Sequence, residues 1–229
     1  MRLMSLVSAA LVLSISRPSF GQEWIEFASR TDFFSVNFPG EPKVRDLAYP
    51  TEYGITLPGH VYSYEDGQSR YAVTVVDYTN IDKLHAARVK GCVGYPDTCN
   101  NPSRNELRGA LDYATWNFLQ RDAKVTHYAY YNADLVEGRR LQLTNADRSR
   151  TFAAIHMHEN RLYIFEGTVP ASAAPPGLFQ QSVGFLDKDG ERVRYQSVYS
   201  NAYPAPPRVN RPGQGPGRGG GQGQGGQAR

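Results

Sequence analysis

Histidine side chains are the first candidates for chemistry in this sequence, because imidazole can bind a metal ion. His156 and His158 are the one close pair among the five histidines. Residues two apart on a strand point to the same face. The pair could therefore hold Zn²⁺ or Cu²⁺ if a third ligand, for which His127 is a candidate, came from a neighbouring strand. The alternative is a polar and aromatic side of a sheet, which would also carry Tyr128, Tyr130, Tyr131 and Tyr163.

The two cysteines, Cys92 and Cys99, are separated by six residues. A zinc site needs three or four ligands, and the CxxC spacing of such sites is absent. In an oxidising compartment, this spacing predicts one local disulfide.

The motifs of the common enzyme classes are missing. There is no GxSxG, HExxH, P-loop or GxGxxG pattern, and the carboxylates are scattered along the chain. We therefore assign no catalytic residue and expect no cofactor, although an enzyme is not excluded. A groove lined by some of the 15 tyrosines could bind a sugar, a peptide or a pigment.

The amino terminus has the pattern of a secretory signal peptide. Arg2 is followed by an apolar stretch from Leu3 to Ile15, and small residues precede a cleavage site after Gly21. We expect residues 1–21 to be removed and the protein to be periplasmic or secreted. No later stretch is long and apolar enough to form a transmembrane segment.

Composition divides the rest of the chain in two. Residues 22–200 contain 19 Lys and Arg and all 22 Asp and Glu, a net charge of −3, which argues against nucleic-acid binding. Residues 201–229 contain 9 glycines, 5 prolines and no acidic residue. Such a segment buries too little apolar surface to order itself. We expect one domain at 23–200 and a disordered tail at 201–229.

Apolar periodicity predicts the elements of this domain. Strands are expected at 24–28, 33–38, 43–47, 55–64, 70–78, 125–135, 139–144, 150–158, 161–169 and 192–195, and helices at 81–90, 103–121 and 175–183. Ser103 to Glu106 matches a capping box at the start of the second helix. A two-residue turn at Glu159 and Asn160 would pair His156 with Tyr163. Tyr62 is expected to face Tyr71 across another hairpin.

This order of elements, with antiparallel strands and helices in separate groups, predicts an α+β fold. Residues 24–42, with the run Phe33 to Gly40, resemble the opening of small exported bacterial domains with the PsbP-like fold. The run Leu178 to Phe185 is similar to the closing helix of that group. The resemblance implies an antiparallel sheet covered by helices on both faces, an α/β/α sandwich. It also implies a binding or assembly factor rather than an enzyme, and it transfers no functional residue.

We therefore expect an exported, non-enzymatic binding or assembly module of the cell envelope. Its partner, an envelope protein or ligand, and its oligomeric state are not predicted. The alternatives are a hydrolase that acts on envelope material and a metal-binding protein that uses His156 and His158.

Overall fold

The computed structural model describes residues 24–90, 101–201 and 203–209. The expected signal peptide at 1–21 and the expected disulfide between Cys92 and Cys99 lie outside these residues. No helix in the described ranges is long and apolar enough to cross a membrane.

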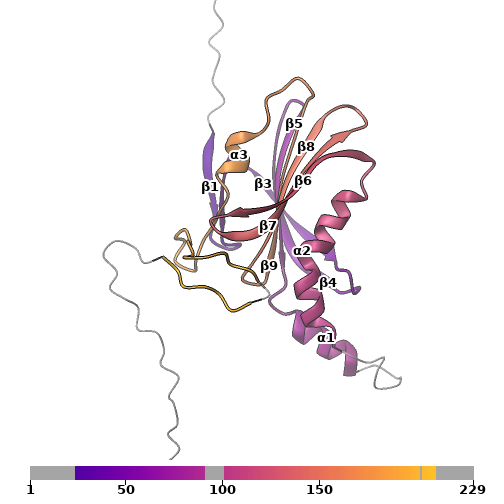
Figure 1. Cartoon of the computed structure of the whole chain (residues 1–229), viewed down its shortest axis with the longest axis vertical. Coiled ribbons are helices and arrows are strands. Elements are labelled where there is room, and N and C mark those ends of the chain that lie inside the picture. Colours follow the sequence, from indigo (N-terminus) through magenta and orange to yellow (C-terminus); the bar gives the residue numbers. More distant parts are fainter. Residues whose placement is uncertain (1–23, 91–100, 202, 210–229) are drawn as a thin grey trace, which may run out of the picture.

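The described chain forms a large antiparallel sheet, a small one and three helices (Figure 1). The elements are β1 Ile25–Ser29, β2 Phe34–Phe38, β3 Lys43–Pro50, β4 Thr56–Asp66, β5 Ser69–Asp77, α1 Ile81–Lys90, α2 Ser103–Leu119, β6 Ala123–Ala133, β7 Val136–Asn145, β8 Arg150–His158, β9 Arg161–Val169, α3 Gly177–Gln181 and β10 Gly184–Phe185. The seven-stranded sheet has the order β3-β4-β5-β9-β8-β7-β6, and the three-stranded sheet has the order β1-β2-β10. The predicted α+β class is confirmed.

The hairpin of β8 and β9 has the predicted register. His156 pairs with Tyr163 and His158 with Arg161. The turn residues Glu159 and Asn160 have φ values of 45° and 59°. Such a two-residue turn matches the twist of the flanking strands, and this match fixes the register.

The register predicted for β4 and β5 is wrong. Tyr71 pairs with Tyr64 rather than with Tyr62. The turn is made by Gly67 and Gln68, one residue later than expected, and Gly67 has φ 57°, which glycine adopts without strain. The resulting shift of two residues leaves Tyr62 and Tyr71 on the same face, so both still enter the same core.

One face of the seven-stranded sheet packs against α1 and α2 (Figure 1). The apolar stripe predicted for α2 is present, since Leu111, Ala114 and Phe118 are all buried there. The strands contribute Leu57, Val76, Leu141, Leu143, Ile155, Met157 and Leu162 to the same cluster.

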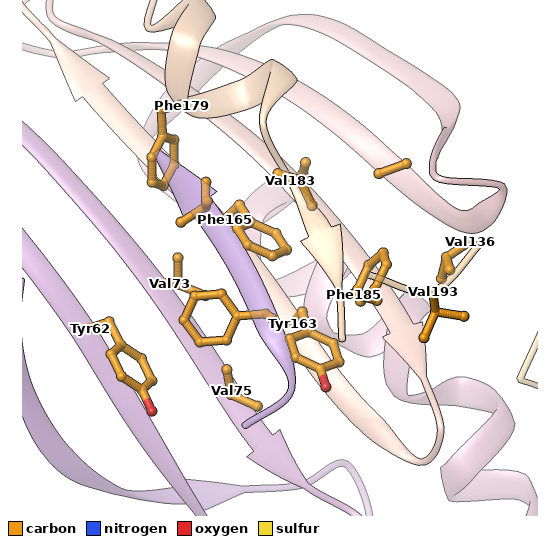
Figure 2. Close-up of a cluster of buried hydrophobic side chains, with 14 of the residues drawn as sticks. Tyr62, Val73, Val75, Val136, Tyr163, Phe165, Phe179, Val183, Phe185 and Val193 are labelled. Carbon is orange, nitrogen blue, oxygen red and sulfur yellow. The ribbon is translucent and has the colours of Figure 1, made fainter. Parts of the chain in front are cut away.

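The opposite face has a different cover from the one expected. In place of a helical layer, it packs against the small sheet, the five-residue helix α3 and the segment that follows β10 (Figures 1 and 2). Figure 2 shows Phe165 of the large sheet between Phe179 of α3 and Phe185 of β10, and Val73 and Val75 belong to the same cluster. The expected α/β/α sandwich is therefore corrected on this face, because short strands and aromatic side chains take the place of a helical layer.

The segment after β10 does not form the expected strand at 192–195. It makes isolated bridges instead, between Leu186 and Arg192 and between Tyr195 and Arg208. The last of these bridges brings residues 203–209 against the domain. The N–H of Val209 donates to the Arg194 carbonyl at 2.8 Å. The sequence predicts disorder from residue 201 onward, whereas in the described chain residues 203–209 are docked against the domain.

Truncation tests the contribution of this docked segment to stability. The free energy of unfolding of a chain that ends at Asn201 is expected to be about 2 kcal/mol lower than that of a chain that ends at Val209. The reason is that each lost hydrogen bond contributes about 1 kcal/mol. For a domain of this size, that loss lowers the melting temperature by roughly 5 °C in thermal denaturation. Equal melting temperatures for the two chains would show that the segment contributes no stability.

Candidate functional site

His156 and His158 lie in the core, behind the segment that follows β10. His156 is 0% exposed to solvent and His158 is 1% exposed. The Nε2 atom of His158 lies 2.9 Å from the Tyr195 hydroxyl. His156 Nδ1 lies 3.1 Å from the Val136 carbonyl, and its ring occupies the space that a side chain at Gly138 would need. The strand opposite His156 must therefore carry glycine at this point.

The rings around the two histidines are aromatic and uncharged. Phe185 lies 5.6 Å from the His156 ring and 4.8 Å from the His158 ring, measured between centroids. Burial lowers the pKa of His156 to about 4 and that of His158 to about 3, and the positive charges of Arg208 and Arg161 add to the shift of His158. Both imidazoles are therefore neutral at pH 7 and belong to the packed core.

The structure does not bring His127 to this pair. His127 is exposed on β6 and pairs with Gln142, whereas the β6 residue beside His156 is Tyr131, at 5.7 Å. Within the described ranges, no three His, Cys, Asp or Glu side chains converge on a point where a metal ion could bind. The hypothesis that His127 completes a metal site with His156 and His158 is wrong, because the three residues lie at different levels of the sheet.

A second cluster was not predicted from the sequence. Asp32, in the turn between β1 and β2, accepts a hydrogen bond from the Tyr62 hydroxyl at 2.7 Å and lies 2.8 Å from His60 Nδ1. His60 is partly exposed, and its Nε2 lies 3.8 Å from Asp46. The nearby hydroxyl of Ser29 bonds to Tyr62 rather than to the imidazole. His60 is thus held between two carboxylates and does not contact the hydroxyl of this cluster.

A polar groove of about 700 Å³ lies beyond the end of α2, between the β4–β5 and β7–β8 turns. Its polar groups mostly bond to one another. Arg121 donates two hydrogen bonds to Glu166, at 2.6 and 3.1 Å, and the hydroxyls of Thr151 and Thr168 lie 2.9 Å apart. A ligand in this groove would have to replace bonds that already exist.

The fourth candidate is formed by three exposed rings, Trp116, Tyr128 and Tyr130, which we call the aromatic surface. Their exposed fractions are 56%, 50% and 57%. By contrast, most of the other aromatic side chains in the described chain are buried or half-buried.

The three rings come from two neighbouring elements. Tyr130 of β6 pairs with Arg139 of β7, which in turn donates to Asp112 of α2 at 3.2 Å. Trp116 follows Asp112 by one helical turn, and Tyr128 precedes Tyr130 by two residues on the same face of the sheet. The contact between Asp112 and Arg139 therefore puts the two tyrosines on the face of the sheet that α2 covers, and Trp116 is one helical turn from that contact.

Comparison with known proteins gives a distant structural similarity. The chain is similar to the solution structure of cyanobacterial PsbP (CyanoP) from Synechocystis sp. PCC 6803, with a TM-score of 0.36 and 13% sequence identity over 68% of this chain and 85% of that chain. This is the fold group that the sequence resembles, and we base no functional conclusion on a similarity of this degree. No family model matches the chain. No curated protein matches it either.

Proposed function

We propose that this chain is an exported, non-enzymatic binding or assembly module of the cell envelope that binds its partner through the aromatic surface. The observation that supports this most directly is the exposure of Trp116, Tyr128 and Tyr130, each at least half accessible to solvent on one side of the domain. The signal-peptide pattern and the cysteine pair support export.

Binding can draw free energy from such a surface. Covering a large apolar side chain contributes roughly 1.5–3 kcal/mol, and tryptophan and tyrosine are enriched among the residues that dominate binding energy. The ion pair between Arg139 and Asp112 borders the rings and supplies polar groups at the rim.

The hydrolase alternative draws on the cluster around His60, because a buried carboxylate can orient an imidazole as a base. The contacts of that imidazole favour binding over hydrolysis. Its partners, Asp32 and Asp46, are both carboxylates, and the Ser29 hydroxyl is directed to Tyr62. This arrangement ties the β1–β2 turn to β4 and does not present an activated nucleophile.

Capture from a solubilised envelope fraction tests the proposal. The immobilised protein and a double variant, Trp116→Ala with Tyr130→Ala, are compared by quantitative mass spectrometry of the retained material. Two truncations at about 1–2 kcal/mol each are expected to reduce recovery of the specific partner at least about tenfold. Melting temperatures should stay close to that of the wild type, since both rings are exposed.

Tyr203→Ala is the matched control, because Tyr203 is 73% exposed and belongs to the C-terminal segment rather than to α2 or β6. It should retain the partner as the wild type does. If the double variant and the control retain the same material in the same amounts, the aromatic surface is not the binding site.

A further inference from the structure

Strand β6 is an open edge of the large sheet. It is the last strand in the sheet order, and among the described residues it pairs only with β7. With 11 residues it is as long as any strand in the described part of the chain. An edge strand presents a row of N–H and C=O groups that another extended chain can pair with.

The two edges of the sheet differ in chemistry. The opposite edge, β3, carries Lys43, Arg45 and Asp46 and ends at Pro50. Charges and proline are the features that keep edge strands from pairing with other chains. The sequence of β6, AKVTHYAYYNA, contains one lysine near its start, no acidic residue and no proline. Near its start β6 has a register shift between Val125 and His127, but from His127 to Ala133 it has no charged residue, proline or further register shift.

The sequence of β6 also suits pairing with an identical strand. In an antiparallel pair with its twofold axis at Ala129, Tyr128 of each copy faces Tyr130 of the other, and His127 faces Tyr131. Aromatic cross-strand pairs stabilise a sheet, whereas like charges opposite one another destabilise it. This register places two tyrosine pairs at the axis and opposes no two charged side chains.

We propose that two copies of this chain pair through β6 to form a twofold-symmetric dimer with one continuous sheet. The axis is perpendicular to the sheet, so the α2 helices of both copies lie on the same face. The two aromatic surfaces then meet, with tyrosines of both β6 strands between the two helices and a Trp116 on each side.

The role of this joined surface in binding rests on the proposed function, but the dimer itself does not. A wider surface with two copies of each ring would bind an extended ligand with more contacts than one copy can provide. The dimer follows from the edge strand alone, whatever the ligand is.

Sedimentation velocity and light scattering of the processed chain measure the assembly directly. The wild-type protein is expected to have twice the mass of the chain at high micromolar concentration. A double variant, Tyr128→Lys with Tyr130→Lys, places lysines opposite each other across the axis and should have the mass of one chain. Val44→Lys, at a 53% exposed position on the β3 edge, is the matched control and should remain a dimer.

A charge-reversal partner distinguishes loss of pairing from loss of folding. The variant Tyr128→Glu with Tyr130→Glu should also be monomeric by itself, but an equal mixture of the lysine and glutamate variants should recover the dimer mass, because each lysine then faces a glutamate. Recovery would support pairing through β6 in this register.

Failure of the mixture to associate would overturn the proposed pairing, as would a wild-type protein that has the mass of one chain. Capture with the single variant Trp116→Ala, which leaves β6 unchanged, remains independent of both results. A monomer that loses its partner through Trp116→Ala overturns the dimer only. A dimer whose captured material is unchanged by that substitution overturns the proposed function only.

Discussion

Lowering the pH from 7 to 4 is expected to destabilise the domain by roughly 6 kcal/mol through His156 and His158, at about 1.4 kcal/mol for each pH unit over which a group takes up a proton on unfolding. Burial lowers the pKa of the two side chains in the folded protein to about 4 and about 3, from a model value of 6.5. The unfolded chain therefore binds more protons than the folded chain below pH 6.5. The contribution of the two histidines to the free energy of unfolding is fully present above pH 6.5. It is lost as the pH falls from 6.5 toward the pKa values of the folded protein.

Urea denaturation at several pH values between 7 and 4 measures this dependence. The double variant His156→Gln with His158→Gln should have a lower free energy of unfolding at pH 7 and a much flatter profile below pH 6.5, because the titrating groups are gone. His127→Gln, at an exposed position on β6, is the control and should keep the wild-type slope. A double variant with the wild-type slope would show that other groups cause the acid sensitivity.

The surroundings of His158 indicate where acid acts first. Its ring lies 5.0 Å from that of Tyr199, and its Nε2 contacts the Tyr195 hydroxyl. Both tyrosines belong to the segment that follows β10, and Tyr199 also hydrogen bonds to Leu135 through its backbone. A charge on His158 would therefore act directly on the packing of this segment against the sheet.

Local patterns in the sequence predicted most of the large sheet. Alternation and turn residues gave the bounds of β8 and β9 and the pairing of His156 with Tyr163, because a two-residue turn leaves one register. The apolar stripe of α2 was also correct. These features depend on residues that are close in sequence.

Features that depend on distant residues were not predicted. Asp32 and His60 are 28 positions apart and meet only because the small sheet packs on the large one. The burial of His158 depends on its contact with Tyr195, which is 37 positions away in the sequence. No spacing rule connects such residues, since the contact is set by the packing of separate elements. The aromatic surface could be suspected from the tyrosine count, but its exposure could not.

At the start of α2, the residues that match a capping box bond to the neighbouring helix instead of capping their own. Ser103 to Glu106 matches a capping box, yet neither side chain caps the helix. The residue before the helix is Pro102, which provides no side-chain cap, and the backbone N–H of Ser103 donates to the Asn101 side chain at 3.0 Å. The Ser103 hydroxyl donates to Asp82, and the Glu106 carboxylate bonds to His85, both on α1. The two side chains thus hold the helices together.

Replacing His85 with alanine is expected to lower the free energy of unfolding by about 3–5 kcal/mol, the cost of removing one partner from a buried pair. Both residues of the pair with Glu106 are 1% exposed. The second carboxylate oxygen, Oε1, has no hydrogen-bond partner in the described structure. Without the imidazole, neither oxygen would keep a partner in a site that excludes water.

The double variant His85→Leu with Glu106→Met removes the hydrogen bond without leaving an unpaired carboxylate in the core. Comparing it with His85→Ala therefore measures the cost of burying the unpaired carboxylate. Because it removes both polar groups and fills their volume, it should be more stable than His85→Ala by about 1 kcal/mol or more. Arg70→Ala breaks an exposed pair with Glu65, at 3.8 Å, and as a control should cost less than about 1 kcal/mol in the same urea titration. If His85→Ala costs no more than this control, the pair does not hold α1 to α2. The contacts of Ser103 and Glu106 with α1 would then add nothing to stability in place of the capping bonds that the two side chains do not make.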